Sequence, residues 1–411
     1  MKRKRPRDTA PSSNTTTSLS PPTASDKPSA HPSARHPARP SAASSGKPSA
    51  KSPPVSSAKQ SPLPKSAKQA KHFAVIGAGI AGIACARTLV QAGHQVTVFE
   101  KSHSAGGRMS TRSSDFGTFD HGTQYFTVRD DRFAKALTTA TGLYKPWSAN
   151  TVRVLDELGR VAAAGLPAKE SHFVAVPGMN ALVQHWAKPL QTNLELATKV
   201  TKIERDTMDA QLWQLRTSGE DDSQHVYSGF DAVLLAIPSE QAHSLLQTSK
   251  QGGDLIKSVR KVSVAPCWTL MVAFANAVQP NMSHLGPQWN AARSTHHRIS
   301  WLARESSKPG RGSVERWTVQ ASPAWSAEHL EDAAARVQAK LIKAFSEVTG
   351  IRAEPTHADV HRWRYAQTSL ALGQSHLWDA KSSIGVCGDW CIGHRVEDGF
   401  ISGLELALAV V

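Results

Sequence analysis

Several residue types are scarce in this chain, and each scarcity excludes a class of protein. Only 4 of the 411 residues are cysteines, and they are scattered, so the sequence does not encode a disulfide framework. Cys387 and Cys391 have no second Cys/His pair at metal-ligand spacing, so no metal site is expected. No stretch reaches the roughly 18 apolar residues of a membrane span. We therefore expect a protein of the reducing cytoplasm.

Aromatic residues are absent from residues 1–71. This segment is rich in Ser, Pro, Ala and Lys, and it holds 14 Lys/Arg against 2 Asp/Glu, so most of the formal net charge of +15 lies there. Such a composition cannot bury enough apolar surface to offset the entropy of ordering, which predicts a disordered basic tail. The cluster from Met1 to Arg7 is typical of a nuclear-import or nucleic-acid patch. A solvated tail and a start site assigned too early are the alternatives.

The folded part begins with a dinucleotide-binding fingerprint. Gly77, Gly79 and Gly82 follow an apolar strand as G-x-G-x-x-G, and an apolar helix runs from there to about Gln91. A second strand then ends at Glu100, 23 residues after Gly77. The glycines permit a tight turn, close approach of backbone N–H groups to a pyrophosphate, and close packing of helix on strand, while the acid suits ribose hydroxyls. The pattern predicts a bound dinucleotide.

Two further glycine-containing segments favour FAD as that dinucleotide. Arg108 follows Gly106 and Gly107 soon after Glu100, and an apolar strand near the C-terminus ends at Gly388-Asp389 before another helix. Together they predict two helix N-termini and a carboxylate around the cofactor. No second G-x-G-x-x-G occurs, so a nicotinamide compound would bind as a substrate and not in a domain of its own.

The sequence resembles the flavin amine-oxidase superfamily over nearly all of 72–411, and within it the renalase-like FAD-dependent oxidoreductases. The segments that carry the resemblance are VIGAGIAG (75–82), VFEKS (98–102), GGRMSTR (106–112), FDHGTQYFT (119–127), PGM (177–179), SSKPGR (306–311), HRWRYA (361–366) and GDWCIGHRVEDGFISG (388–403). The last two, with the DHG-QYF run, are the more specific. The tail matches nothing.

The resemblance implies FAD held without a covalent bond, because renalase-like proteins do not use a cysteine link. It implies that the following residues contact the cofactor: Gly77, Gly79, Ile80, Ala81, Gly82, Glu100, Lys101, Gly107, Arg108, Val200, Gly388, Asp389, Val396, Glu397 and Ser402. His121, Gln124 and Tyr125 would lie near the flavin ring as catalytic candidates, although plain packing explains His121 and Tyr125 equally well. Val233 to Pro238 would lie on the adenine side.

The expected fold class is α/β, with a Rossmann-like FAD-binding domain of the amine-oxidase type and an inserted domain of sheet plus helix. The FAD-binding domain is expected at 72–125, 170–240 and 370–411, and the substrate domain at 126–169 and 241–369. Helices are expected from Asp130 to Ala140, from about Asn180 through Trp186, and from a cap at Ser326 to Gly350. Strands are expected at 231–238, 268–274, 299–303, 317–321 and 360–365.

The resemblance implies an oxidase of isomeric NAD(P)H that transfers hydride to flavin N5, with O2 as the acceptor giving H2O2. Such chemistry needs no general base, and the sequence holds no plausible triad or carboxylate dyad. It needs cations for the substrate phosphates, and Arg304, Lys308 and Arg311 are the candidates, with Arg293, Arg298, Arg316, Arg362 and Arg364 nearby. The ordinary explanation of these charges is that they lie at solvated ends of strands. The ordinary explanation of Trp301 and Trp363 is that they pack in the core.

Two other functions stay open at this point. An amine or polyamine oxidase would bind a cationic substrate and would favour aromatic walls and carboxylates over arginines. A non-catalytic flavoprotein acting through the basic tail would bind nucleic acid with a steep dependence on salt. The oligomeric state cannot be inferred from the sequence.

Overall fold

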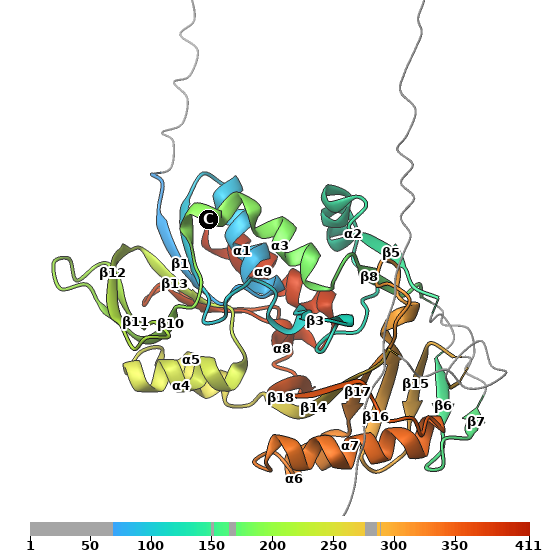
Figure 1. Ribbon diagram of the computed structural model, residues 1–411. Helices are drawn as coiled ribbons and strands as arrows, with labels where there is room; N and C mark the ends of the chain where they lie inside the picture. Colours follow the sequence, from blue (N-terminus) through green and yellow to red (C-terminus); the bar gives the residue numbers. More distant parts are fainter. Residues whose placement is uncertain (1–68, 149–151, 164–169, 276–285, 288) are drawn as a thin grey trace, which may run out of the picture. The chain divides into compact units, whose positions relative to one another are not determined.

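The computed structural model describes residues 69–148, 152–163, 170–275, 286–287 and 289–411 (Figure 1). The predicted tail therefore lies almost wholly outside the described residues. Among the residues that are described, no helix is both long enough and apolar enough to span a bilayer.

A six-stranded sheet, parallel except at one edge, forms the centre of the nucleotide-binding part. Its order is β19-β20-β13-β1-β2-β9, and only β19 runs antiparallel to its neighbour. The strands are β1 (His72–Ile76), β2 (Gln95–Phe99), β9 (Leu194–Glu195), β13 (Ala232–Leu235), β19 (Leu377–Asp379) and β20 (Ile384–Val386). All residues of β13 and β20 are buried, as expected for strands covered on both faces.

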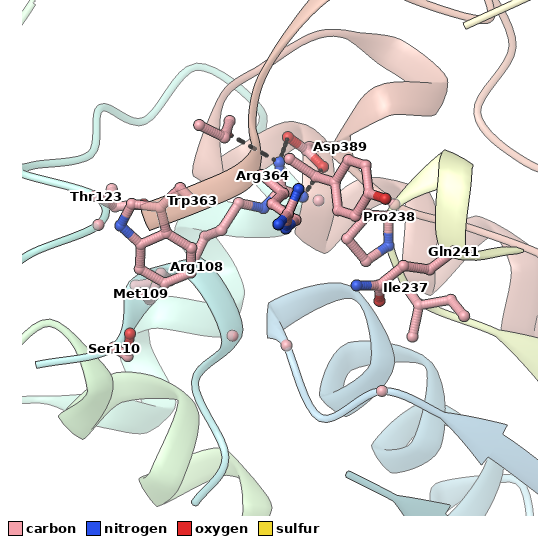
Figure 2. Close-up of a pocket in the computed structure, with 18 of the residues that line it drawn as sticks. Arg108, Met109, Ser110, Thr123, Ile237, Pro238, Gln241, Trp363, Arg364 and Asp389 are labelled. Atoms are coloured by element: carbon pink, nitrogen blue, oxygen red, sulfur yellow. Dashed lines mark hydrogen bonds and ion pairs between the residues drawn. The ribbon is translucent and has the colours of Figure 1, made fainter. Parts of the chain in front are cut away.

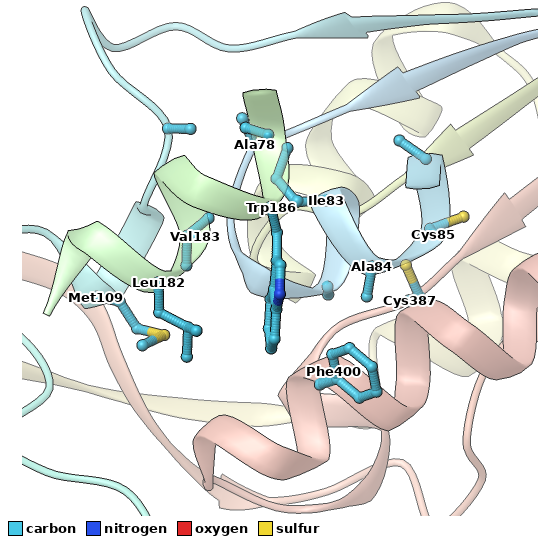
Figure 3. Packing of buried hydrophobic residues seen from close by; sticks show 14 of the residues in the cluster. Ala78, Ile83, Ala84, Cys85, Met109, Leu182, Val183, Trp186, Cys387 and Phe400 are labelled. Atoms are coloured by element: carbon cyan, nitrogen blue, oxygen red, sulfur yellow. The ribbon is translucent and has the colours of Figure 1, made fainter. Parts of the chain in front are cut away.

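Helices cover one face of this sheet. They are α1 (Ile80–Gln91), α2 (Asp131–Leu137), α3 (Asn180–Ala187) and α9 (Val396–Val410). The short helix α8 (Asp389–Ile392) precedes α9 and contributes Trp390 and Cys391 to the core on the opposite face. Trp186 of α3 lies beside Phe400 of α9, with ring centroids 5.5 Å apart, and both lie against the α1 side chains Ile83 and Ala84 (Figure 3). Phe133 of α2 joins them at 5.2 Å from Phe400.

The other face of the six-stranded sheet packs against a small antiparallel sheet and two helices. The elements are β10 (Lys199–Arg205), β11 (Trp213–Ser218), β12 (Gln224–Phe230), α4 (Ser239–Ser249) and α5 (Gly253–Val259). Their buried side chains, among them Trp213, Leu246 and Val259, share one core with Val233 of β13.

A seven-stranded sheet with helix α7 behind it forms the inserted part. Its order is β18-β14-β17-β16-β15-β6-β7. The elements are β6 (Arg153–Leu155), β7 (Val161–Ala163), β14 (Ser263–Phe274), β15 (Ala291–Ser294), β16 (Ile299–Arg304), β17 (Glu315–Ala321), β18 (His357–Leu370), α6 (Pro323–Glu328) and α7 (Ala334–Thr349). Phe345 of α7 lies 6.0 Å from Phe274 and 5.8 Å from Trp317, which places the core between helix and sheet.

Short elements complete the chain. Two hairpins are β3 (Arg112–Ser114) with β4 (Gly117–Phe119) and β5 (Tyr144–Pro146) with β8 (Phe173–Ala175). Short 3-10 helices are η1 (Gly107–Met109), η2 (Thr138–Ala140), η3 (Lys188–Asn193) and η4 (Glu305–Ser307). The predicted α/β class, with a Rossmann-like part and an inserted sheet plus helix, is confirmed.

Packing places two of the predicted domain limits elsewhere. Helices α4 and α5 belong to the nucleotide-binding core, so the second segment of the inserted part begins at Ser263 and not near residue 241. Helix α2 also packs on the nucleotide-binding side, through Phe133, although 126–169 was assigned to the substrate domain. Within that segment, β6 and β7 do join the inserted sheet.

The predicted cap at Ser326 is wrong. Ser326 is buried in α6, where its hydroxyl accepts the backbone N–H of Trp268 at 3.1 Å. The side chain that caps α6 is Ser322, which accepts the N–H of Trp325 at 3.3 Å, and α7 starts only at Ala334. The predicted end is right, because Gly350 terminates α7 at a φ of +74°.

Candidate active site

The fingerprint forms a tight turn between β1 and α1. The N–H of Gly77 donates to Phe99 O at 2.7 Å, and its φ of +106° is one that glycine tolerates. A Cβ on Gly82 would lie 1.9 Å from Gly77 O, so helix and turn pack too closely for any other residue. A Cβ on Gly79 would meet no protein atom within 4 Å, because this position faces the cavity described below.

Glu100 stands at the end of β2, beside the turn. Its side chain accepts the N–H of Ala78 at 2.8 Å and that of Ser102 at 2.9 Å, and only 7% of the residue is exposed. These bonds fix the carboxylate at the cavity wall. A carboxylate held there is able to accept hydrogen bonds from ribose hydroxyls.

Arg108 and Asp389 meet across the turn, although 281 residues separate them. The guanidinium donates to both carboxylate oxygens, with Nη1 3.0 Å from Oδ2, and also to Ala366 O of β18 at 3.3 Å. In Figure 2 this pair lies between Trp363 on one side and Ile237, Pro238 and Gln241 on the other. Arg108 thus connects the Gly-Gly-Arg turn, the C-terminal segment and the inserted sheet.

These groups surround a cavity of about 1400 Å³. The predicted cofactor residues that line it are Gly77, Gly79, Ile80, Ala81, Glu100, Lys101, Gly107, Arg108, Val200, Gly388, Asp389 and Val396. Residues from both the nucleotide-binding part and the inserted sheet form its wall, so the cavity can hold an extended dinucleotide with one end against the inserted sheet.

The inserted sheet supplies a wall of rings and arginines. The lining residues from this sheet and its loops are Pro266, Cys267, Arg293, Ser300, Trp301, Gln320, Ala321, Pro323, His361, Arg362, Trp363, Arg364, Tyr365, Ala366 and Gln367. Trp363 stacks on His121, with centroids 5.2 Å apart, and donates its indole N–H to His121 O at 2.9 Å. Among the described residues of this wall there is no Asp or Glu.

Two of the histidines that line the cavity, His121 and His361, are held neutral. Burial, then the neighbouring His361 and the positive charge of Arg112, lower the pKa of His121 to about 3. Burial and Arg112 lower the pKa of His361 to about 4. His121 therefore carries no proton to donate as an imidazolium at neutral pH. His121 is therefore a flat, neutral ring at the cavity wall.

The other two catalytic candidates take different positions. Tyr125 lines the cavity and stacks near His172 at 4.2 Å and Trp301 at 5.7 Å. Gln124 also lines it, but its amide is engaged with protein: Nε2 donates to Asp120 O and Gly122 O, and Oε1 accepts from Lys308 Nζ at 3.3 Å. Its position suits holding the 121–125 segment more than touching a substrate.

The three predicted phosphate-binding residues do not line the cavity, which corrects that expectation. Lys308 Nζ lies 3.1 Å from Asp120 Oδ2 and 2.9 Å from Glu305 Oε1, and Arg311 Nη2 lies 2.6 Å from Asp120 Oδ2, with all these side chains fully buried. Arg304 pairs with Glu315 at 3.0 Å. These cations neutralise protein carboxylates, so they are not available to a substrate.

Three predicted cofactor residues also lie behind the cavity wall. Gly82 packs on the turn, and Glu397 accepts the N–H groups of Arg129 and Asp130 at 2.7 and 2.6 Å. Ser402 accepts the N–H of Gly388 at 2.8 Å. Gly82 and Ser402 support cofactor-facing backbone without facing the cavity, while Glu397 holds the segment that leads into α2.

Sequence reasoning missed Gln320 and Arg395. Gln320 of β17 donates to Gly122 O at 2.7 Å and so joins the inserted sheet to the 121–125 segment. Arg395 lines the cavity just before α9. The alternation of side chains along β17 assigns Gln320 to one face of the strand. Nothing in the sequence showed that this face contacts the 121–125 segment.

The donor set and the open space fit FAD. The Cβ position of Gly79 is empty, the turn presents backbone N–H groups, and the cavity volume exceeds what a mononucleotide needs. Cys387 and Cys391 are fully buried and do not line the cavity, which opposes a covalent link through either thiol. The N–H groups of the turn, Glu100, Arg108 and Asp389 are the groups that would hold the cofactor.

Comparisons with known proteins agree with this geometry. A model of the NAD(P)-binding Rossmann-like domain matches residues 75–139, and that of the flavin containing amine oxidoreductases matches residues 163–411. Renalase of Mus musculus is 24% identical over 366 residues, covering 82% of this chain and 97% of its own. A 4,4'-diapophytoene desaturase of Staphylococcus haemolyticus is 51% identical over 57 residues, only 14% of this chain and 11% of that protein.

Solved structures show the same fold. A putative protoporphyrinogen oxidase from Exiguobacterium has a TM-score of 0.63 at 13% identity, covering 83% of this chain and 99% of the other. A putrescine oxidase bound to putrescine has a TM-score of 0.62 at 11% identity, with the same coverage. With more than half of its length matched by the family model, the protein belongs to the flavin containing amine oxidoreductases, as a renalase-like, FAD-dependent oxidoreductase.

Proposed function

We propose that the protein oxidises a dihydronicotinamide, an isomer of NADH or NADPH, with O2 as the electron acceptor. The balanced reaction takes one dihydronicotinamide, one proton and O2 to one oxidised nicotinamide and H2O2. Bound FAD supplies the redox chemistry, since it can accept a hydride and return two electrons to O2. The protein's own residues bind the substrate, orient its ring and exclude water.

The charge of the cavity wall carries this proposal. Seven Lys or Arg residues line the cavity against three acids: Lys101, Arg108, Lys199, Arg293, Arg362, Arg364 and Arg395 against Glu100, Glu240 and Asp389. Glu100 binds backbone N–H groups, Asp389 is paired with Arg108, and Glu240 accepts the Ser239 hydroxyl at 3.0 Å. Arg362 and Arg364 pair with Glu331, and Arg395 lies 3.5 Å from Glu170. Lys101, Lys199 and Arg293 are the lining cations that have no carboxylate partner among the described residues, and their positive field attracts a substrate that carries phosphate.

The shape of the wall agrees with a flat ring as substrate. His121 and Trp363 stack at an interplanar angle of 25°, and Tyr125 and Trp301 continue the aromatic surface. Because His121 stays neutral, it adds no charge beside the reacting ring. Hydride transfer needs no general base, so a wall without a free carboxylate suits this reaction.

An amine oxidase is the second candidate, favoured by the family and by the fold shared with putrescine oxidase. A cationic amine gains from a carboxylate at the site and loses from arginines. The described wall of the inserted sheet provides arginines and no carboxylate. The charge balance therefore favours the dihydronicotinamide.

Anaerobic mixing decides between the two. The full-length protein, saturated with FAD, is mixed with partly isomerised NADH, with NADPH treated in the same way, and with a panel of mono-, di- and polyamines. We expect dihydronicotinamides alone to bleach the flavin absorbance, and readmitted O2 to restore it with equimolar H2O2. Bleaching by an amine, with none by the dihydronicotinamides, contradicts the proposal in favour of amine oxidation.

A further inference from the structure

We infer that Gln320 is a positioning residue for the flavin ring and that it acts through the 121–125 segment. Gln320 Nε2 donates to Gly122 O at 2.7 Å, and this bond joins the inserted sheet to the nucleotide-binding part. By fixing the segment, Gln320 fixes the wall against which the ring lies. This role concerns the flavin chemistry that the family shares, so it holds whichever substrate reduces the flavin.

The 121–125 segment stands at the end of the cavity that is left for the flavin ring. All five of its residues line the cavity: His121, Gly122, Thr123, Gln124 and Tyr125. Glu100 suits the ribose of the adenosine, and the turn at Gly79 suits the pyrophosphate. A dinucleotide anchored at these two points leaves the part of the cavity beyond Arg108, beside the segment and the inserted sheet, for its ring.

One face of the inserted sheet meets the segment with two hydrogen-bond donors. Gln320 of β17 lies opposite Thr269 of β14. Trp363 of β18 lies opposite Cys267 of β14. Thr269 and Cys267 are two residues apart on one strand, so Gln320 and Trp363 project from the same face of the sheet. Because the indole N–H of Trp363 donates to His121 O at 2.9 Å, two strands of the sheet bind consecutive carbonyls of the segment.

Backbone contacts hold the other side of the segment. A Cβ on Gly122 would lie 2.1 Å from Arg108 O, so the two chains are in close contact there. The N–H of Thr123 donates to the same Arg108 O at 2.8 Å. The segment therefore lies between the Gly-Gly-Arg turn and the inserted sheet, and side-chain donors of the sheet fix one of its two sides.

The other bonds of the segment do not replace the bond from Gln320. Gln124 Nε2 also donates to Gly122 O, at 3.2 Å, but Gln124 belongs to the segment and does not anchor it to the sheet. Asp120 anchors the residue before the segment, where its carboxylate accepts the N–H of Met179 at 2.9 Å and binds Lys308 Nζ at 3.1 Å. Gln320 acts further along, at the cavity wall itself.

Gln320→Met tests this role, because it removes the amide donor and keeps most of the length of the side chain. In protein stripped of FAD, we expect hydrogen–deuterium exchange of the 121–125 segment to rise roughly fivefold or more. In protein saturated with FAD, we expect the visible circular dichroism of the flavin to change. We also expect the limiting rate of anaerobic flavin reduction to fall roughly tenfold, with KM changed less than about twofold, because a small misplacement costs rate more than binding.

Trp363→Phe is the second variant. It keeps an aromatic ring and removes the donor to His121 O, so the same measurements should change in the same direction. Gln214→Met is the matched control. Gln214 of β11 also donates its amide at 2.7 Å, to Glu204 Oε1, but it does not line the cavity. We expect this control to lower the melting temperature slightly and to leave the exchange of the segment and both flavin measurements unchanged.

The design separates this role from the proposed reaction. Exchange and dichroism need no substrate, and the rate is measured with the compound that bleaches the wild-type flavin in the anaerobic experiment above, whether dihydronicotinamide or amine. A rise in exchange together with a change in either flavin measurement, absent from Gln214→Met, supports the positioning role. If exchange stays at the wild-type value, or rises while both flavin measurements stay unchanged, Gln320 only supports the fold and the positioning role is overturned.

Discussion

Gly79 and Gly82 belong to one motif, but glycine is required at the two positions for different physical reasons. A Cβ at Gly79 enters open cavity, while a Cβ at Gly82 would strike Gly77 O. Gly79 has a φ of −72° and a ψ of 178°, which any residue can adopt. We therefore expect Gly79→Val to fold normally and to lose FAD, measured as the ratio of flavin to protein absorbance after purification.

Two other glycines supply the controls for this prediction. Gly253→Val, at an exposed position whose Cβ also meets nothing, should keep FAD and fold alike. Gly82→Ala should instead lower the melting temperature or prevent folding. Stoichiometric FAD in purified Gly79→Val would contradict the placement of the cofactor in this turn.

A second single-residue effect is the loss of folding stability at acid pH. His121 has its pKa lowered to about 3, so between that value and its ordinary value of 6.5 the unfolded chain binds a proton that the folded chain does not. Stability due to the neutral ring is thus complete above about pH 6.5 and is lost as the pH falls. At about pH 5 the loss is on the order of 2 kcal/mol.

Denaturant unfolding across this pH range tests the effect. We expect His121→Gln to show a flatter decline of unfolding free energy between neutral pH and about pH 5 than the wild type does. The exposed His225, changed to Gln, provides the comparison and should follow the wild type. A His121→Gln curve parallel to the wild-type curve would show that this ring does not govern the acid response.

Single residues also show how far sequence reasoning reached. Gly77, Gly79, Glu100, Arg108 and Asp389 all line the cavity, because each belongs to a motif whose geometry is fixed by the backbone. Lys308 and Arg311 were misjudged because a cation in a sequence does not reveal its partner. Their partner, Asp120, lies 188 and 191 residues away.

At the scale of elements, that buried cluster joins the segment after β4 to the loop between β16 and β17. Burial opposes the charge of Asp120, but Lys308 and Arg311 outweigh it and hold the pKa of Asp120 below its usual range. Burial raises the pKa of Glu305. Removal of one cation leaves an uncompensated carboxylate in a fully buried site, which is costly.

Lys308→Met tests this junction, because it removes the charge and leaves most of the side-chain volume. We expect the free energy of unfolding to fall by about 3–5 kcal/mol, measured by chemical denaturation. Lys257→Met breaks an exposed pair with Asp254, at 3.0 Å, and should cost no more than about 1 kcal/mol. Equal effects of the two substitutions would refute a structural role for the buried cluster.

Elements were predictable where a local signal determines them. The strands of the inserted sheet were expected nearly where β14, β16, β17 and β18 occur, because their apolar runs have no competing helical period. The start of α7 was not, since Ser326 has the residue type of a cap but is used by Trp268 of a distant strand. Tertiary contact decided which serine caps a helix.

At the scale of the whole molecule, the cavity is where the two sheets meet. Its wall takes residues from the first turn, from β18 and from the segment before α9, and Arg108 contacts both Asp389 and Ala366. This assembly could not be derived from sequence, because it depends on segments hundreds of residues apart. Motif spacing predicted which residues bind a dinucleotide, but not which face of the inserted sheet lies against the cavity.

A ligand in such a position stabilises the protein that binds it. FAD bound to the folded state alone adds about 2.7 kcal/mol to the free energy of unfolding at a hundredfold excess over its Kd. We expect protein stripped of FAD to melt at a lower temperature, and added FAD to restore the melting temperature in proportion to the logarithm of its concentration. Gly79→Val should melt like the stripped wild type and ignore added FAD, since its Val side chain occupies the cofactor's space. If FAD shifts both proteins equally, it binds somewhere other than this cavity.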